Sequence, residues 1–293
     1  MNKLFEMLAP SFVLRNSLYG SVLLGAFVPL IGAFLVIGRR TILALALPQV
    51  STLGVAAAVS ILTYCGIQHP RLSALLQFAA MFGGAVVAMS AALLWHFVLA
   101  PRVKKPEDAE LGAIYAVAAA LTLALAASNF VPELGLLDTL RGEILALPSS
   151  LLWAEFLGFA ALGLVLAAFA RPLHAVLYDR TLAYASGLPT DFLSALTTAL
   201  IAATIALGGL CAGPLTIFAF LVLPAVTFLP HVRHVRTLYT CCAVTGVVCA
   251  FGGFWISYAI EDWTLPIPAA QIALMGLVWL ISRTFALTGR GMR

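Results

Sequence analysis

Long apolar runs alternate along the chain with short connections that carry most of the charged residues. Each run has about the 20 residues that a helix needs to cross the hydrocarbon core of a bilayer. Membrane helices are predicted at residues 17–38, 45–66, 74–100, 111–131, 151–170, 192–208, 213–230, 237–260 and 267–286. The pattern therefore predicts an all-α integral membrane protein, a polytopic helix bundle of about eight or nine transmembrane helices.

The composition supports this prediction and leaves little room for a soluble domain. Of the 293 residues, 62% are apolar and 10% are charged, whereas ordinary soluble domains have roughly 25% charged residues. We therefore expect residues 1–293 to form a single transmembrane domain. The cysteines are expected to be small packing residues, because they lie within or beside apolar runs and form no C-x-x-C pair. The basic residues are dispersed, which argues against nucleic-acid binding.

The distribution of basic residues predicts the orientation, because Lys and Arg are retained on the cytoplasmic side of a membrane. If the connection after the first helix is cytoplasmic, that side collects Arg39, Arg40, Arg102, Lys104, Lys105, Arg171, Arg180, Arg233, Arg236, Arg283, Arg290 and Arg293. The opposite side holds Lys3, Arg15, Arg71 and Arg141, together with the acidic Glu143 and Asp262. We therefore expect a multi-pass protein of the cell (inner) membrane, with the N-terminus outside and the C-terminus in the cytoplasm.

Helix breakers gather between the two short runs at 192–208 and 213–230. The connection reads Gly208-Gly209-Leu-Cys-Ala-Gly213-Pro214, and Pro224 interrupts the second run. Two interpretations stay open at this point. The segment is either a simple turn on the outside or a broken hairpin whose glycines and prolines act as gating or hinge positions.

A structured cytoplasmic connection is predicted between the fifth and sixth runs. Asp179 can cap a helix, residues 181–186 continue it, and Gly187 stops it. A helix of about two turns is marginal in water unless it packs on something. Its candidate contact residues are Arg180, Leu182 and Ala183. The segment, about 179–187, is either a connector resting on its own bundle or a coupling helix that docks on a soluble partner.

Four segments in this order resemble the permeases of the zinc and manganese importing ABC transporters, the ABC-3 family. They are Gly32-Ala-Phe-Leu-Val-Ile-Gly-Arg39-Arg40, Gly142-Glu143-Ile-Leu-Ala-Leu-Pro-Ser149, Tyr178-Asp179-Arg-Thr-Leu-Ala-Tyr-Ala-Ser-Gly187-Leu-Pro189 and Gly213-Pro-Leu-Thr-Ile-Phe-Ala-Phe-Leu-Val-Leu-Pro224-Ala225-Val-Thr227. The resemblance implies a type II importer-like bundle. It also implies a partner ATPase subunit that binds ATP and Mg²⁺, a second permease copy or paralogue, and an extracytoplasmic solute-binding protein. The sequence agrees that this chain binds no nucleotide cofactor, because it lacks the motif G-x-x-x-x-G-K.

The chain departs from the family where the family reads Gly-Asp-Ala-Leu-Ser-His-x-x-x-Pro-Gly. This chain has no carboxylate there, and Gln49 stands about where the histidine would be. An amide is a poor zinc ligand beside imidazole or thiolate. The metal ligands are therefore unknown, and Gln49, Ser51 and Thr52 are the candidate lining of the translocation path, or else they cross-link helices by hydrogen bonds.

Ionisable groups inside a membrane are costly and are usually functional. Glu155 is a further candidate for the path, although a position near the membrane surface would let it reach water. His96 lies near a helix end and can snorkel. The resemblance favours a divalent metal ion as cargo. A chelated metal, another small solute, and a secondary transporter driven by an ion gradient stay open as alternatives, and no cluster of His, Asp or Glu suggests a membrane enzyme.

Overall fold

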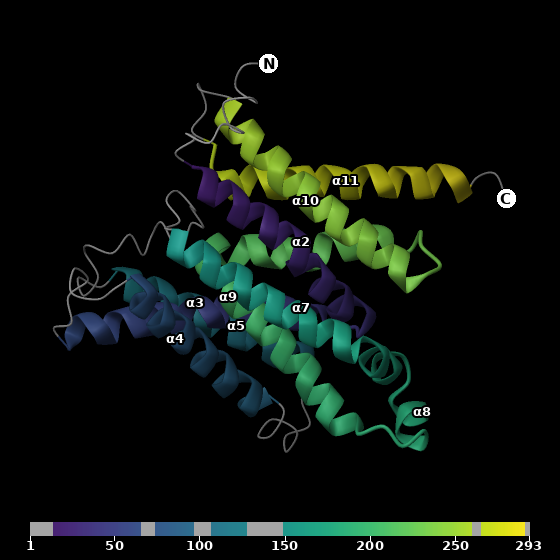
Figure 1. Ribbon diagram of the computed structural model, residues 1–293, viewed down its shortest axis with the longest axis horizontal. Helices are drawn as coiled ribbons and strands as arrows, with labels where there is room; N and C mark the ends of the chain where they lie inside the picture. Colours follow the sequence, from purple (N-terminus) through teal and green to yellow (C-terminus); the bar gives the residue numbers. More distant parts are fainter. Residues whose placement is uncertain (1–13, 66–73, 97–106, 128–148, 260–264, 291–293) are drawn as a thin grey trace.

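The computed structural model describes residues 14–65, 74–96, 107–127, 149–259 and 265–290, most of which form long helices (Figure 1). The helices are α2 (Arg15–Ile37), α3 (Thr41–Tyr64), α4 (Ala74–Leu94), α5 (Glu107–Ala127), α7 (Ser149–Tyr178), α8 (Arg180–Ala185), α9 (Thr190–Phe228), α10 (Val235–Ala259) and α11 (Ile267–Arg290). Seven described helices are long and apolar enough to cross a membrane, and α4 contains a shorter apolar stretch, Phe78–Leu94. The predicted all-α multi-pass architecture is confirmed.

Two groups of helices share α9 as their common neighbour. On one side α2 packs on α7, α9 and α10, and α11 packs on α9 and α10. On the other side α3 packs on α4, α5 and α9, in the blue part of the view (Figure 1). Glycines set the closest approaches: Gly25 meets Gly246 between α2 and α10, and Gly54 meets Gly84 between α3 and α4. Close backbone contact of this kind is how helices associate in lipid, where apolar burial alone provides no drive.

The structure corrects the prediction of two separate helices at 192–208 and 213–230. α9 runs through residues 208–212 as helix, and only Gly213, with φ 71° and ψ 162°, leaves the helical backbone. Glycine reaches this positive φ without a steric penalty, and Pro214 then has no N–H to continue the ladder. The predicted break is therefore present, but it is confined to one residue because side chains of neighbouring helices pack against Gly208 and Gly209, which precede it.

The two limbs of α9 fold back on each other at this break. Gly208, in the first limb, packs beside Ile217 in the second. Residues 190–212 are about 34 Å long as a helix, enough to cross the hydrocarbon core, whereas residues 214–228 reach only about 22 Å. The second limb alone is therefore shorter than a complete membrane span, and both ends of α9 lie at the same end of the bundle.

We call this end the α8 end, because α8 lies there at the lower right of the view (Figure 1). Contacts with the last turns of α2 define it. Phe34 packs with Leu173 of α7 and Leu193 at the start of α9. Ala33 packs with Ala225, near the end of α9. The end of α7 and both ends of α9 therefore meet here.

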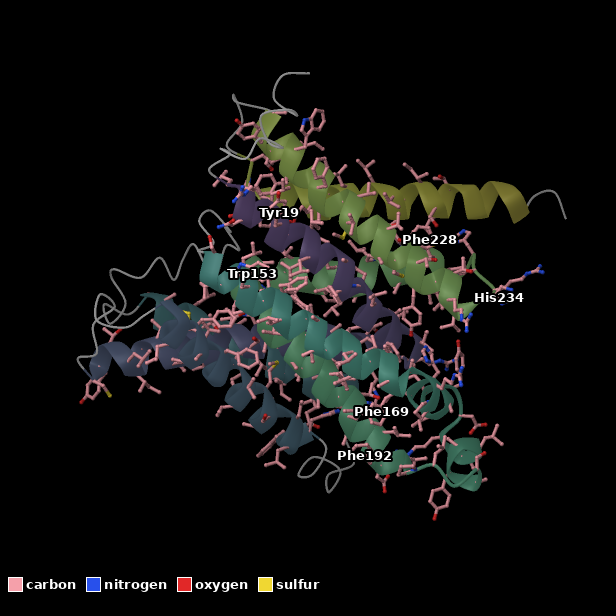
Figure 2. All side chains as sticks on the ribbon, viewed as in Figure 1. Tyr19, Trp153, Phe169, Phe192, Phe228 and His234 are labelled. Atoms are coloured by element: carbon pink, nitrogen blue, oxygen red, sulfur yellow. The ribbon has the colours of Figure 1, made fainter. Side chains whose placement is uncertain are left out.

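The opposite end brings together the starts of α2 and α7, the end of α10 and the start of α11. The Asn16 side-chain amide donates a hydrogen bond of 3.1 Å to the Ser149 hydroxyl. Leu18 packs with Phe254 near the end of α10. Tyr19 and Trp153, both more than half exposed, lie toward this end in Figure 2, whereas Phe228 and His234 lie toward the α8 end. Exposed aromatic rings of this kind are enriched where helices leave the hydrocarbon core.

Charged side chains differ between the two ends in the described part of the chain. The α8 end carries Arg39, Arg40, Arg171, Arg180, Arg233 and Arg236, whereas Arg15 lies at the opposite end. Other residues on which the predicted orientation depends, Lys104, Lys105, Glu143 and Asp262, lie outside the described residues. Figure 1 thus shows the arrangement of the helices, and the side that faces the cytoplasm stays a prediction from the basic residues.

Candidate functional site

The short helix α8 begins with the cap that the sequence predicts. Asp179 has an extended backbone, with φ −150° and ψ 98°, and its side chain accepts hydrogen bonds from the backbone N–H groups of Thr181 and Leu182. Both bonds are 2.9 Å long. These are the N–H groups that a first helical turn leaves without partners, so the cap stabilises a helix of only six residues.

The end of α8 is equally well defined. Gly187 has φ 80°, a left-handed conformation that glycine adopts without penalty. Its N–H donates to the Tyr184 carbonyl, and the N–H of Leu188 donates to the Ala183 carbonyl. This pair of bonds is a Schellman motif, which satisfies the last carbonyls of the helix. The predicted stop at Gly187 is confirmed.

The side chains of α8 divide between the bundle and the surroundings. Ala183 is 3% exposed and anchors the helix, whereas Leu182 and Tyr184 are 66% and 74% exposed. Arg180 forms an ion pair of 2.7 Å with Asp191 at the start of α9. Because both charged groups are exposed, this pair contributes little stability. The structure thus holds α8 by its caps and by Ala183, and its larger apolar side chains are left uncovered by the described residues.

The polar residues predicted to line a path lie on α3. Gln49 is half-buried, and Ser51 and Thr52 are buried. The Thr52 hydroxyl donates 2.8 Å to the Pro48 carbonyl, so it is satisfied within its own helix. The Ser51 hydroxyl lies beside Gly209 of α9 and has no hydrogen-bond partner among the described residues. Ser51 is therefore the member of this group that faces the first limb of α9.

Glu155 is enclosed by the bundle and is not exposed to water in this conformation. It is 0% exposed, and neither carboxylate oxygen has a hydrogen-bond partner among the described residues. The alternative in which Glu155 reaches water does not hold in this conformation, because the carboxylate is buried where α7 and α9 pack together. A buried carboxylate without partners is costly, and such groups in membrane proteins are usually functional.

The neighbour of Glu155 on α9 is Cys211, which is 7% exposed. The thiol and the carboxylate interact electrostatically without forming a well-aligned hydrogen bond. Sequence reasoning treated Cys211 as a packing residue and missed this contact. Its position among the helix breakers before Gly213 was the available signal, but nothing in the sequence linked it to a residue 56 positions earlier.

Glu155 and Ser51 approach the first limb of α9 from two different helices. Glu155 on α7 meets Cys211, and Ser51 on α3 meets Gly209. Residues 209 and 211 point about 200° apart around a helix, so the two contacts lie on different faces of the limb. The structure therefore brings Glu155 to the break in α9 but does not join it to the polar residues of α3.

A cavity of about 610 Å³ opens at the α8 end, between α4 and the first limb of α9. Its walls are mainly apolar and include Met89 and Leu93 of α4, and its polar rim includes Arg40, Arg180 and Asp191. Glu155, in contrast, is fully buried and lines no part of this cavity. The bundle is thus closed around Glu155 and open toward the α8 end.

In the described part of the chain no group of three or more His, Cys, Asp or Glu side chains gathers to form a metal centre. His96 is buried rather than snorkelling to a surface. His231 lies 3.0 Å from the Thr227 carbonyl through Nδ1. Sequence reasoning missed His174, whose Nε2 lies 2.7 Å from the Tyr239 hydroxyl and joins α7 to α10 near the α8 end.

Comparisons with known proteins find membrane proteins of transport systems. A sequence model described as the ABC 3 transport family matches residues 11–286. The manganese transport system membrane protein MntC of Halalkalibacterium halodurans is 24% identical over 256 residues, covering 86% of this chain and 81% of MntC. A Haemophilus influenzae protein named "Probable iron transport system membrane protein" is 25% identical over 207 residues, covering 71% of this chain and 70% of that protein.

The fold is also similar to a solved structure. A chain in the structure of PsaBC from Streptococcus pneumoniae in complex with Fab matches with a TM-score of 0.80 and 20% sequence identity. The match covers 96% of this chain and 94% of that chain. The arrangement of helices is therefore shared over nearly the full length of both chains.

Proposed function

This chain belongs to the ABC 3 transport family, and we propose from that premise that it carries a divalent metal ion, zinc or manganese, into the cell. As a member of the family it is the permease of an ABC transporter, the component that spans the membrane. ATP and Mg²⁺ bind on a separate ATPase subunit, because this sequence lacks the loop that cradles phosphates. The permease is therefore the moving part of the importer and not its enzyme.

The observation that carries the coupling to an ATPase is α8, a short helix fixed by caps that exposes apolar side chains at the arginine-rich end. We assign its exposed face, with Asp179, Arg180, Leu182 and Gly187, to docking of the ATPase subunit, and Ala183 to holding α8 on its own bundle. An exposed apolar surface on a helix outside the membrane is typical of an interaction site. Closure of the ATPase dimer would then pull on α8 and favour one of two access states of the bundle.

The proposal also assigns each end of the bundle to one side of the membrane. The α8 end faces the cytoplasm, because it collects most of the described arginines, and the N-terminus lies outside. The location is the cell (inner) membrane. The functional unit contains a second permease, either another copy or a paralogue, and an extracytoplasmic solute-binding protein delivers the ion to the opposite end.

Residues along α3 and α9 supply the proposed route. We assign Gln49, Ser51 and Thr52 on α3 to the lining on one face of the first limb of α9. Glu155 approaches a different face of that limb from α7, and we assign it to the route near the break. The break at Gly213 and Pro214 serves as a hinge, together with the other breakers Gly208, Gly209 and Pro224. Hinges of this kind absorb a change in backbone angles when one limb moves against the other. The relatives named for manganese and iron transport support a metal as cargo.

A chelated metal is the second candidate cargo, and one observation favours it. The cavity at the α8 end is lined by Arg40 and Arg180 against the single carboxylate of Asp191, and this excess of positive charge suits an anionic chelate better than a bare cation. The described residues also contain no group of three or more metal-ligating side chains of the His, Cys, Asp or Glu type. A chelate needs no such group, because it brings its own ligands.

Radiometal uptake tests the proposal and separates the two cargoes. Cells that make the complex are compared with cells lacking this chain, using ⁶⁵Zn²⁺ and ⁵⁴Mn²⁺, with ATP hydrolysis blocked in the partner ATPase as a control. We expect uptake of zinc or manganese that needs both the chain and ATP hydrolysis. Dependence that appears only when a chelator accompanies the metal would transfer the proposal to the second cargo. Uptake independent of the chain in every condition would refute both.

A further inference from the structure

The site around Glu155 is built from two helices that pack in register. Glu155 on α7 faces Cys211 on α9, and one turn further along Gly158 packs against Leu207. The shared spacing shows that one stripe of α7 lies along one stripe of the first limb of α9. The contact between carboxylate and thiol is therefore part of the helix packing and not an isolated approach of two side chains.

Both side chains are closed off from solvent in this conformation. Glu155 is 0% exposed and Cys211 is 7% exposed, and the carboxylate oxygens have no hydrogen-bond partner in the described part of the chain. A carboxyl group that only filled space would be expected to find such a partner, because an unsatisfied buried polar group costs about 1–3 kcal/mol. The Glu155 carboxylate oxygens are therefore available to bind a ligand between α7 and α9.

The position of the pair along the membrane suits a transported ion. Glu155 lies six residues beyond Ser149, about 9 Å into the bundle from the end opposite α8. Cys211 lies two residues before the break at Gly213, where the first limb ends. The carbonyl end of a helix favours a positive charge, and Pro214 provides no N–H for the Leu210 carbonyl. Interrupted helices at such positions often hold ions in transporters.

We propose that the Glu155 carboxylate and the Cys211 thiolate are the ligands that this permease offers to its cargo inside the membrane, and that the cargo is a thiophilic divalent cation of the zinc kind. Zn²⁺ binds thiolate and carboxylate together, whereas Mn²⁺ prefers oxygen and nitrogen ligands. The inference rests on the proposed function and deepens it, since it decides between the two metals named there.

Binding at this pair is balanced by the release of protons. A cation that binds the thiol displaces the thiol proton to water, and any proton on the carboxyl leaves as well. With only two strong protein ligands the cation completes its coordination with water or a carbonyl oxygen. Such a site holds the ion weakly enough to release it toward the α8 end when the limbs of α9 separate.

Uptake by the complete complex in cells tests the pair, and the chain offers a matched control. We compare Cys211→Ser and Glu155→Gln with Cys249→Ser, which alters another buried cysteine, on α10. Membrane abundance and thermal denaturation are measured for each variant. We expect Cys211→Ser to lower zinc uptake roughly tenfold or more while manganese uptake is kept or raised, because only the thiophilic ligand is lost. Glu155→Gln should lower the uptake of both ions, and Cys249→Ser should change neither.

A direct binding measurement uses the full chain in lipid nanodiscs with Cd²⁺ as a thiophilic probe. In a variant that keeps Cys211 and has alanine at the other cysteines, the absorption from sulfur-to-cadmium charge transfer should appear on addition of Cd²⁺. The band should disappear in Cys211→Ser and weaken in Glu155→Gln. No band with Cys211 present, or an unchanged ratio of zinc to manganese uptake in Cys211→Ser, overturns the inference while the permease function stands. Absence of any metal uptake by the unmodified complex would instead refute the proposed function.

Discussion

Replacing Gly187 by valine tests whether the shape of α8 couples the permease to its ATPase. The backbone of Gly187 has φ 80°, and a Cβ built there meets no atom within 4 Å. The cost of the substitution is therefore a backbone cost alone. For an L-residue in the left-handed region it is about 1–2 kcal/mol, and a β-branched side chain lies toward the upper part of that range.

That cost is large for so small a helix. α8 has six residues, and helices of this length have no stability of their own in water. About 1.4 kcal/mol changes an equilibrium tenfold. Asp179→Ala removes the two capping bonds and costs about another 1 kcal/mol. Together the two changes lower the equilibrium constant for forming α8 correctly by roughly 50-fold or more, while the membrane helices are untouched.

The assay measures how much ATPase subunit co-purifies with the tagged permease and how much ATP the complex hydrolyses during transport. We expect the double variant Asp179→Ala/Gly187→Val to insert normally and to lose most of both signals. Gly187→Asn is the matched control, because asparagine tolerates the left-handed conformation, and it should behave nearly as the unmodified chain. If the double variant binds the ATPase and transports as before, α8 is a passive connector and the assignment of its exposed face is wrong.

Three other predictions concern packing, orientation and the path. Gly84→Ala should destabilise the protein by about 1–3 kcal/mol and lower its thermal denaturation temperature, because the new Cβ meets a backbone carbonyl of α3. Gly83→Ala is the control and should leave the denaturation temperature unchanged, since its Cβ meets no atom within 4 Å. Equal effects of the two variants would contradict the observed α3–α4 contact. A membrane-impermeant maleimide should label the exposed Cys65 in intact cells or spheroplasts. It should not label a cysteine placed at Arg233 in a variant that lacks Cys65. The reverse pattern would invert the proposed orientation. Gln49→His should hold the metal longer and slow uptake, and Gln49→Leu should impair passage by removing polar lining; unchanged uptake in both would remove Gln49 from the path.

The sequence by itself determined the features that depend on a continuous stretch of residues. Apolar runs of spanning length predicted the helices, because the hydrocarbon core sets the same requirement for every run. The sequence also predicted both caps of α8. Asp179 and Gly187 act on backbone groups within five residues of themselves, so their types and spacing were sufficient to predict both ends of that helix.

Only the tertiary structure decided which faces of those helices meet. In a soluble protein an apolar stripe marks the buried face, but in a bilayer the faces toward lipid and toward protein are both apolar. The sequence therefore gave no sign that Glu155 faces Cys211, or that Ser51 faces Gly209. The break at Gly213 was visible as a cluster of helix breakers. Its restriction to one residue, and the folding of the second limb back along the first, depended on the neighbouring helices that hold the glycines in helical conformation.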